Sequence, residues 1–575
     1  MIRKSLIALS LLGVGLSISL NAASAPSAKP EQKKAKPQTF LWNNATVYFL
    51  LTDRFNNADK ANDLAYGRKA DAAPLRGFMG GDLKGIIAKI KDGYFDRLGV
   101  NAIWMTPPVE QIHEGTDEGT GKSYGFHGYW AKDFTKVDAN VGTDKDFKNL
   151  VEIAHQHGIR VLLDVVMNHT GPVTDGDAVW PADWVRTEPA CDYHTADGAI
   201  KCTLVKNLPD FFTESDKAVE LPPFLVQKWK QEGRYEQETK ELETYFGRTG
   251  YPRAPRYYLM KWHTDWIRKY GVDGFRVDTV KHVEATVWKE LKHEASLAYE
   301  EWKLAHPKLK LSDDAFFMTA EAYNYPIRDG LLFRMDGGSR INYYAHGFDS
   351  MINFGFKSDA HQPYETLFSQ YSGYLSGELK NYSVLNYISS HDDGSPFDPA
   401  RLQPFVAATK LMLSPGSAQI YYGDETARLL NVSEAQGDAK LRSMMNWGAL
   451  QNNLPIASMQ NIAPGQVKPS TRELLLHWQK LGQFRRAHVA VGAGVHQQLS
   501  AAPYVFKRSY QHDGVSDVVI VALDLPVAKV HQLDVSGVFS DGEKIRDYYS
   551  GKTSIVKAGK LELPGQYSII LLGKP

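Results

Sequence analysis

The chain has 575 residues, of which 43% are hydrophobic, and its 66 basic and 66 acidic side chains give a formal net charge of zero at pH 7. A chain without excess charge or a long basic run has no electrostatic footprint for a polyanion, so we expect no nucleic-acid partner. After the N-terminal region no segment is apolar over the roughly 20 positions that a bilayer span needs, so we expect no membrane anchor.

Residues 1–25 are typical of a secretory signal peptide. A charged start precedes an apolar run from Leu6 to Leu20, and small residues follow up to Ala25. A membrane anchor is the alternative, but the run is short and ends in small residues. Residues 26–39 are rich in Pro and Lys and lack apolar periodicity, which predicts a flexible linker. We therefore expect an exported protein.

Eight apolar, strand-like runs follow along the chain, several of them succeeded by amphipathic helical segments. From the fourth run onward their spacing suits one strand, one helix and two loops. This alternation predicts a (β/α)8 barrel, with chemistry at the C-terminal ends of its strands. We expect the barrel over residues 40–169 and 255–490. The runs begin near Thr46, Val100, Ile159, Val272, Ala315, Ser350, Ser383 and Ala418.

The interval between the third and fourth runs is far longer than one strand and helix require. We therefore expect an inserted subdomain over residues 170–254. Both cysteines of the chain, Cys191 and Cys202, fall inside it. In an exported chain a disulfide is the natural interpretation, with two buried free thiols as the alternative. No zinc-type spacing of Cys and His accompanies them.

The sequence pattern changes in residues 491–575. Alternating stretches such as YVFKRSY and VSDVVIVALDL are separated by turn residues. This pattern predicts a C-terminal antiparallel β domain.

Polar and charged residues stand at the ends of four of the apolar runs. A parallel strand that is buried on both faces is nearly continuously apolar, so a charged group at its C-terminal tip indicates a site. The tips carry Asn168 and His169, Arg276 and Asp278, Glu321, and His391 and Asp392.

Three carboxylates, Asp278, Glu321 and Asp392, come from the fourth, fifth and seventh runs and should converge. Crowding and burial raise the pKa of at least one carboxyl group, which separates an acid from a base or nucleophile. Glycoside hydrolysis uses such a pair. Arg276 lies two residues before Asp278 on the same strand face, where it would keep that carboxylate ionised.

Four strings at these strand ends, residues 164–169, 274–278, 320–324 and 389–393, resemble the conserved regions of the alpha-amylase family of glycoside hydrolases, in the same order. The resemblance covers roughly residues 45–490 and is greatest to bacterial periplasmic members. It implies that Asp278 is the nucleophile, Glu321 the general acid/base and Asp392 the carboxylate that stabilises the transition state. Supporting segments include Thr52-Asp53-Arg54-Phe55, Gly80-Gly81-Asp82, His127-Gly128-Tyr129 and Leu208-Pro209-Asp210.

The resemblance also implies the substrate contacts. Tyr129 would stack on the sugar at the point of cleavage, with His169, Arg276 and His391 around it. Lys281 and His282 would contact the leaving-group side of the glucan.

Calcium is the cofactor that the resemblance implies, because hard oxygen donors suit this ion. Asn168, Asp210 and the backbone carbonyl of His282 match the ligands of an ion that pins the insertion to the barrel. A second candidate is an Asn- and Asp-rich loop, for which an ordinary turn is the alternative. That loop offers Asn57, Asp59, Asn62, Asp63, Gly80 and Asp82.

The resulting expectation is a retaining, endo-acting hydrolase of alpha-1,4-glucans such as starch, glycogen-type glucans and maltodextrins. A transglycosylating or maltooligosaccharide-forming relative is one alternative. A catalytically silent glucan-binding protein is the other, since fold alone does not establish activity. We expect a monomer, and the resemblance favours the periplasm over the external medium.

Overall fold

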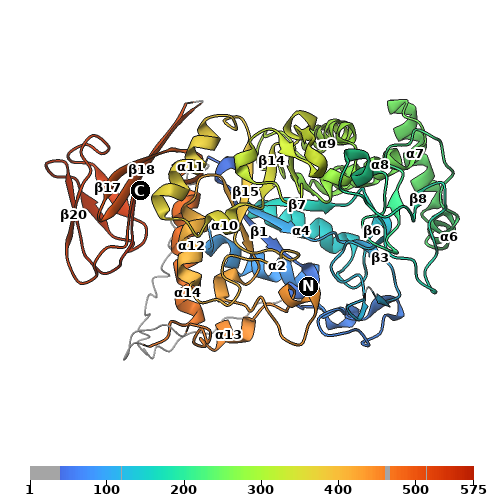
Figure 1. Ribbon diagram of the computed structural model, residues 1–575, viewed down its shortest axis with the longest axis horizontal. Coiled ribbons are helices and arrows are strands. Elements are labelled where there is room, and N and C mark those ends of the chain that lie inside the picture. The colour runs from blue at the N-terminus through green and yellow to red at the C-terminus, as the bar shows by residue number, and fades with distance from the viewer. Residues whose placement is uncertain (1–38, 118, 460–466, 513) are drawn as a thin grey trace, which may run out of the picture. The chain divides into compact units, whose positions relative to one another are not determined.

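Eight parallel strands form a closed barrel in the computed structural model, which describes residues 39–117, 119–459, 467–512 and 514–575 (Figure 1). Each strand pairs with its neighbours in chain order, and the last pairs with the first. All eight are buried over their whole length. The predicted barrel is therefore confirmed. Its strands are β1 (Thr46–Leu50), β2 (Ala102–Met105), β7 (Arg160–Val165), β10 (Gly274–Val277), β11 (Phe317–Ala320), β14 (Ser350–Asn353), β15 (Ser383–Tyr387) and β16 (Ser417–Tyr421).

The strand starts agree closely with the sequence-based expectation. Strands β14 and β15 begin at the residues predicted, Ser350 and Ser383. Strands β2, β10 and β11 begin two residues later than expected, because Val100, Val272 and Ala315 precede the first ladder pairs. The signal peptide and residues 26–38 of the linker lie outside the described residues.

Long helices follow seven of the barrel strands. Capping boxes fix the starts of two of them: the side chains of Thr143 and Ser470 each form one with the acidic residue three positions later. Between β11 and β14 the described chain has no α-helix, only 3-10 turns and the short hairpin of β12 (Phe333–Arg334) and β13 (Arg340–Ile341). The long helices are α2 (Leu83–Lys91), α4 (Asp144–Gln156), α8 (Pro255–Tyr270), α9 (Ala285–Ala305), α11 (Tyr364–Ser376), α12 (Pro404–Leu413) and α14 (Thr471–Ala487).

The insertion between β7 and α8 is small in secondary structure and rich in loops. Its sheet has only two short strands, one of which begins at Asp210. Its elements are β8 (Val185–Arg186), α5 (Ala196–Ile200), β9 (Asp210–Phe211), α6 (Pro223–Gln231) and α7 (Tyr235–Thr249). A second insertion, between β2 and α4, was not predicted from the sequence. In it β3 (Val109–Gln111) pairs with β6 (Ala131–Val137). Strand β3 is too short for its alternation to be recognised.

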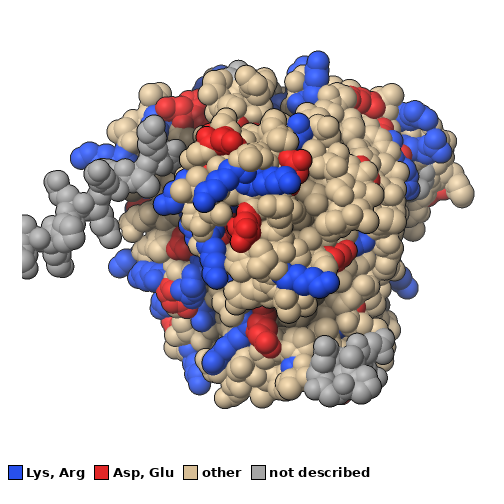
Figure 2. All heavy atoms as spheres, turned by 90° about the vertical axis from the view of Figure 1, so that its left-hand side faces the viewer, with Lys and Arg blue, Asp and Glu red and all other residues tan. Residues whose placement is uncertain are grey.

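The C-terminal part is the expected antiparallel β structure. Its six-stranded sheet runs in the order β17-β18-β19-β24-β21-β22, with β20 and β23 paired separately. On this side of the molecule basic and acidic side chains are interspersed (Figure 2). The strands are β17 (Val495–Ala501), β18 (Tyr504–His512), β19 (Val515–Leu523), β20 (His531–Asp534), β21 (Lys544–Asp547), β22 (Thr553–Ile555), β23 (Lys560–Leu563) and β24 (Ile570–Gly573).

One buried arginine joins this sheet to the barrel through backbone carbonyls: Arg508 on β18 donates to the carbonyls of Leu413 and Val491. A second buried arginine, Arg485 on α14, links two helices of the barrel by donating to the carbonyl of Met412 on α12 at 3.0 Å. In the part of the chain that the structure describes, no helix combines the length and apolarity that a bilayer crossing demands.

Candidate active site

The C-terminal ends of the barrel strands bring the predicted residues together. Asp278 directly follows β10, Glu321 directly follows β11, and Asp392 lies five residues past β15. Because parallel strands end at the same rim, these side chains share one face of the barrel. The sequence argument for convergence therefore agrees with the geometry.

Arg276 is the cation at the centre of the carboxylates. Its guanidinium is 2.7 Å from Asp278 Oδ1, 2.9 Å from Asp164 Oδ1 and 3.6 Å from Glu321 Oε2. The side chain is 1% exposed, so these interactions are screened little by water. The arrangement pairs the Asp278 carboxylate with a fixed positive charge and fixes its orientation.

Burial separates the acid strengths of the carboxyl groups. It raises the pKa of Glu321 to about 8; Arg276 lowers that pKa, while the neighbouring charges of Asp278 and Asp392 raise it further. The pKa of Asp392 is also raised by burial. Glu321 Oε2 accepts a 2.7 Å hydrogen bond from the backbone of Thr279. The site thus combines a protonated carboxyl on Glu321 with an arginine-paired carboxylate on Asp278.

Asp164 is a site residue to which the sequence argument gave no role. It accepts from Tyr129 Oη at 2.8 Å and from Trp104 Nε1 at 3.0 Å, besides its contact with Arg276. Burial raises its pKa to about 7. Its position inside an apolar strand was the available signal, because an unpaired charge there would be costly.

Rings and imidazoles surround the carboxylates. The rings of Tyr129 and His391 are stacked, with centroids 5.4 Å apart. Burial lowers the pKa of His391 and of His169, so both imidazoles are neutral at pH 7. Neutral imidazoles offer hydrogen bonds without adding positive charge.

A cavity of about 450 Å³ opens beside the carboxylates. Lys281, expected on the leaving-group side, extends between two exposed rings, with Nζ 5.3 Å from the Tyr193 centroid and 5.5 Å from that of Tyr323. The sequence argument had not assigned either tyrosine, although Tyr323 lies in one of the four strings. The lining is Tyr193, Leu204, Asp278, Thr279, Lys281, His282, Glu321, Tyr323, Asn324 and Asp392.

Two residues of this lining have strained backbones. Thr279 has φ of 49° and Asn324 has φ of 72°, values that side chains other than glycine rarely adopt. Both follow a catalytic candidate, Asp278 and Glu321 respectively. Strain held at such positions is typical of a functional site.

The predicted disulfide joins Cys191 and Cys202, with Cα atoms 4.7 Å apart. The loop it closes contains Tyr193, and the Ala199 carbonyl lies 2.7 Å from His282 Nδ1. The two sulfur atoms and His282 are close enough to suggest a metal site. Because both sulfurs are in the disulfide, they supply no thiolate ligand.

The first calcium candidate fits a cation. Asp210 is buried, its Oδ1 has no hydrogen-bond partner, and burial raises its pKa to about 7. Its Oδ2 accepts from Asn168 Nδ2 and from the backbone of Leu204, both at 3.1 Å. The Nδ1 atom of His282 contacts the Ala199 carbonyl, and the ligand expected from this residue is its backbone carbonyl. A hard divalent ion would satisfy the buried carboxylate oxygen.

The second calcium candidate fits in part. Asn57 Oδ1 and Asn62 Oδ1 are buried without partners. A Cβ added at Gly80 would meet Asn57 Nδ2 at 2.2 Å and Asp63 Oδ1 at 2.6 Å, so these groups crowd around the glycine. The remaining carboxylates already have protein partners: Asp59 pairs with Lys84 at 2.6 Å, and Asp82 caps α2 by accepting from Gly85 N at 2.6 Å.

Comparison with known proteins agrees with this geometry. Residues 49–494 match the family described as alpha amylase, catalytic domain. The periplasmic alpha-amylase of Escherichia coli is 36% identical over 534 residues, 83% of this chain and 72% of that protein. A cyclomaltodextrin glucanotransferase of a Bacillus strain is 27% identical over 71% of this chain and 53% of its own. The alpha-amylase of Geobacillus thermoleovorans, solved in complex with acarbose, has a TM-score of 0.59 at 21% identity, covering 93% of this chain and 99% of that one.

Proposed function

The chain belongs to the alpha-amylase family of glycoside hydrolases, and on that premise we propose that it hydrolyses internal alpha-1,4-glucosidic bonds with retention of configuration. The substrates are starch, glycogen-type glucans and maltodextrins. The observation that carries the proposal is the pairing of Arg276 with Asp278 beside a Glu321 carboxyl whose pKa is raised by burial. An ionised nucleophile and a protonated acid are what the first step of this reaction needs.

In the first step Asp278 attacks the anomeric carbon as the glycosidic bond breaks. The leaving oxygen takes the proton of Glu321, and the glycosyl group is held as an ester of Asp278. In the second step the Glu321 carboxylate takes a proton from water, whose oxygen attacks the anomeric carbon and releases Asp278. Two inversions give net retention. Asp392 stabilises the positive charge that develops on the sugar.

The surrounding residues bind and orient the glucan. Tyr129 stacks on the sugar at the point of cleavage, with Arg276 and the neutral imidazoles of His169 and His391 beside it. On the leaving-group side, Lys281 and His282 contact the next sugar. A neutral substrate is compatible with this mixture of rings and hydrogen-bonding groups.

Calcium would be held by Asn168, Asp210 and the carbonyl of His282, with Asn57, Asp59, Asn62, Asp63, Gly80 and Asp82 as a second candidate set. When bound, the ion would supply fixed positive charge that ties the insertion to the barrel. The unpartnered Asp210 oxygen is the observation that supports the first site.

A second candidate function is transglycosylation. The exposed rings of Tyr193 and Tyr323 on either side of Lys281 favour it, because aromatic surfaces beyond the cleavage point would hold an acceptor sugar. A catalytically silent glucan-binding protein is less well supported, since all three catalytic carboxylates are present.

We also propose that the protein is exported to the periplasm. The N-terminal signal features and the similarity to a periplasmic protein of Escherichia coli support it. We propose a monomer.

The product time course on soluble starch tests the function, with Glu321→Gln as the matched control. Hydrolysis should release mixed maltooligosaccharides that first appear as alpha anomers by NMR. The variant should lose several orders of magnitude in rate, on the scale of roughly 5 kcal/mol. Beta-anomeric products, or a fully active folded variant, would exclude the mechanism. Products longer than the substrate when maltotriose is supplied would favour transglycosylation.

A further inference from the structure

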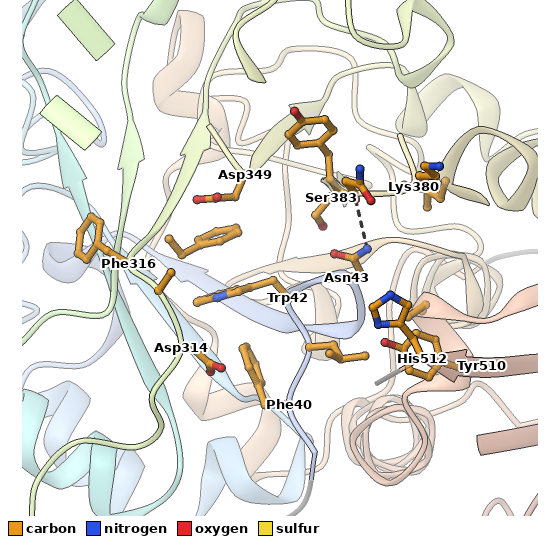
Figure 3. A pocket seen from close by; sticks show the side chains of 18 residues that line it. Phe40, Trp42, Asn43, Asp314, Phe316, Asp349, Lys380, Ser383, Tyr510 and His512 are labelled. Carbon is orange, nitrogen blue, oxygen red and sulfur yellow. Dashed lines mark hydrogen bonds between the residues drawn. The ribbon is translucent and has the colours of Figure 1, made fainter. Parts of the chain in front are cut away.

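A second cavity lies at the end of the barrel opposite the candidate active site. Its volume is about 510 Å³, within the roughly 300–1,000 Å³ typical of small-molecule sites. Residues 40–43 before β1, the starts of β11 and β15, and the end of β18 bound it (Figure 3). The catalytic carboxylates follow the other ends of these barrel strands, so this basal cavity is separate from the active site.

Aromatic rings form much of the basal cavity. Trp42 lies near its centre, stacked on Phe317 with centroids 3.8 Å apart and planes at 11°. Phe40 meets Trp42 edge-on at 4.9 Å. Tyr510 and His512 stand on the opposite side in Figure 3. Trp42, Phe40 and Tyr510 are only partly buried, and the Arg160 guanidinium covers one face of Phe40, 3.4 Å from its centroid.

Most polar groups of the basal cavity are neutral or paired, and among the lining residues that the structure describes Lys380 is an exposed cation (Figure 3). The two carboxylates of the cavity are each paired: Asp314 with Arg160 at 2.8 Å, and Asp349 with Lys292. Pairing leaves little uncompensated negative charge for a cation. Asn43 donates to the Tyr382 carbonyl at 3.2 Å, and Asn381 is exposed. Rings combined with amide and carbonyl groups are suited to a polyhydroxyl compound.

We propose that the basal cavity is a second alpha-glucan site, which holds a short segment of the polymeric substrate away from the catalytic carboxylates. The identity of the ligand rests on the proposed function. A polymer held at two points has a raised effective concentration at the active site. An oligosaccharide too short to reach both sites gains nothing from the second.

The test uses the double variant Tyr510→Ala, Asn381→Ala, which changes two partly or fully exposed side chains. Tyr567→Ala, in the C-terminal domain but outside the basal cavity, is the matched control. In a Glu321→Gln background, the double variant should bind insoluble starch about tenfold more weakly, the size expected for loss of an aromatic contact and a hydrogen bond. In the active enzyme, kcat/KM for a short chromogenic maltooligosaccharide should stay within about twofold of wild type. Unchanged starch binding, or an equal loss on both substrates, would overturn the proposal.

A separate measurement distinguishes failure of this inference from failure of the proposed function. Calorimetric titration of Glu321→Gln with maltoheptaose should show two classes of site, and the double variant only one. If the wild-type enzyme cleaves no alpha-glucan, the proposed function fails. If it cleaves short substrates but the titration shows a single site in both proteins, only the basal cavity assignment fails.

Discussion

Replacing Arg276 by Met should reveal how much of the catalytic rate depends on one buried cation. The guanidinium lies 2.7 Å from Asp278 and 2.9 Å from Asp164, with 1% of the side chain exposed. At an effective dielectric constant of about 20, unit charges about 4 Å apart attract by about 4 kcal/mol. Losing this attraction leaves the buried Asp278 carboxylate without the charge that positions and stabilises it. We expect kcat/KM at pH 7 to fall by about 10³, because each 1.36 kcal/mol changes the rate tenfold.

The pH profile of kcat/KM on a short chromogenic maltooligosaccharide separates this effect from simple destabilisation. The alkaline limb should move to higher pH in Arg276→Met, because the charge of Arg276 lowers the pKa of Glu321. Arg428→Met is the matched control: Arg428 is also buried but donates to the Tyr422 carbonyl at 2.8 Å, not to a carboxylate. The control should lower the melting temperature and leave the alkaline limb in place. A folded Arg276→Met enzyme with the wild-type alkaline limb would refute the assignment.

Three further predictions follow from the same structure. Burial raises the pKa of Glu321 to about 8, so its protonated carboxyl is present below that pH and lost above it. We therefore expect kcat/KM to decline as the pH rises through about 8. A flat profile up to pH 10 would argue against Glu321 as the general acid. Serine at both Cys191 and Cys202 should cost about 2 to 3 kcal/mol of stability, since the bridge closes a loop of separation 11, and thiol titration of the denatured, unreduced protein should find no free thiol. Chelation should lower the melting temperature and the activity together, and calcium should restore both better than magnesium. At a hundredfold excess over its Kd, calcium should contribute about 2.7 kcal/mol to the free energy of unfolding. If neither quantity changes after verified metal removal, the assignment to Asp210 is contradicted.

The barrel could be predicted from sequence because its strands are buried on both faces. An uninterrupted apolar run such as that around β7 (Arg160–Val165) leaves few alternatives, and a charged residue at its end stands out. The small strands β3 (Val109–Gln111) and β9 (Asp210–Phe211) could not be predicted in the same way. Their pairing depends on tertiary contacts, and neither strand is long enough to show a period.

The residues of the candidate site also differ in how well the sequence predicts them. Residues fixed to strand tips, such as Asp278 and Glu321, were identified from position alone. Tyr193 was not, because it reaches the site through the disulfide loop and no local pattern records that approach. Asp164 could not be assigned from sequence for another reason: its role depends on contacts with Arg276 and Tyr129, which come from distant parts of the chain.

The closure of the barrel between β1 and β16 also bears on how the chain folds. Tyr48 and Glu425, which meet through a 2.6 Å hydrogen bond at this seam, are 377 positions apart in the chain. Contacts between residues so far apart in sequence form slowly, because the intervening chain loses conformational entropy before the contact contributes any stabilising free energy. Until β16 is available, β1 and β15 are open sheet edges with unpaired backbone groups. A nascent or truncated chain that ends before Ser417 should therefore be protease-sensitive and prone to association; a soluble, protease-resistant fragment would show that the sheet tolerates an open seam.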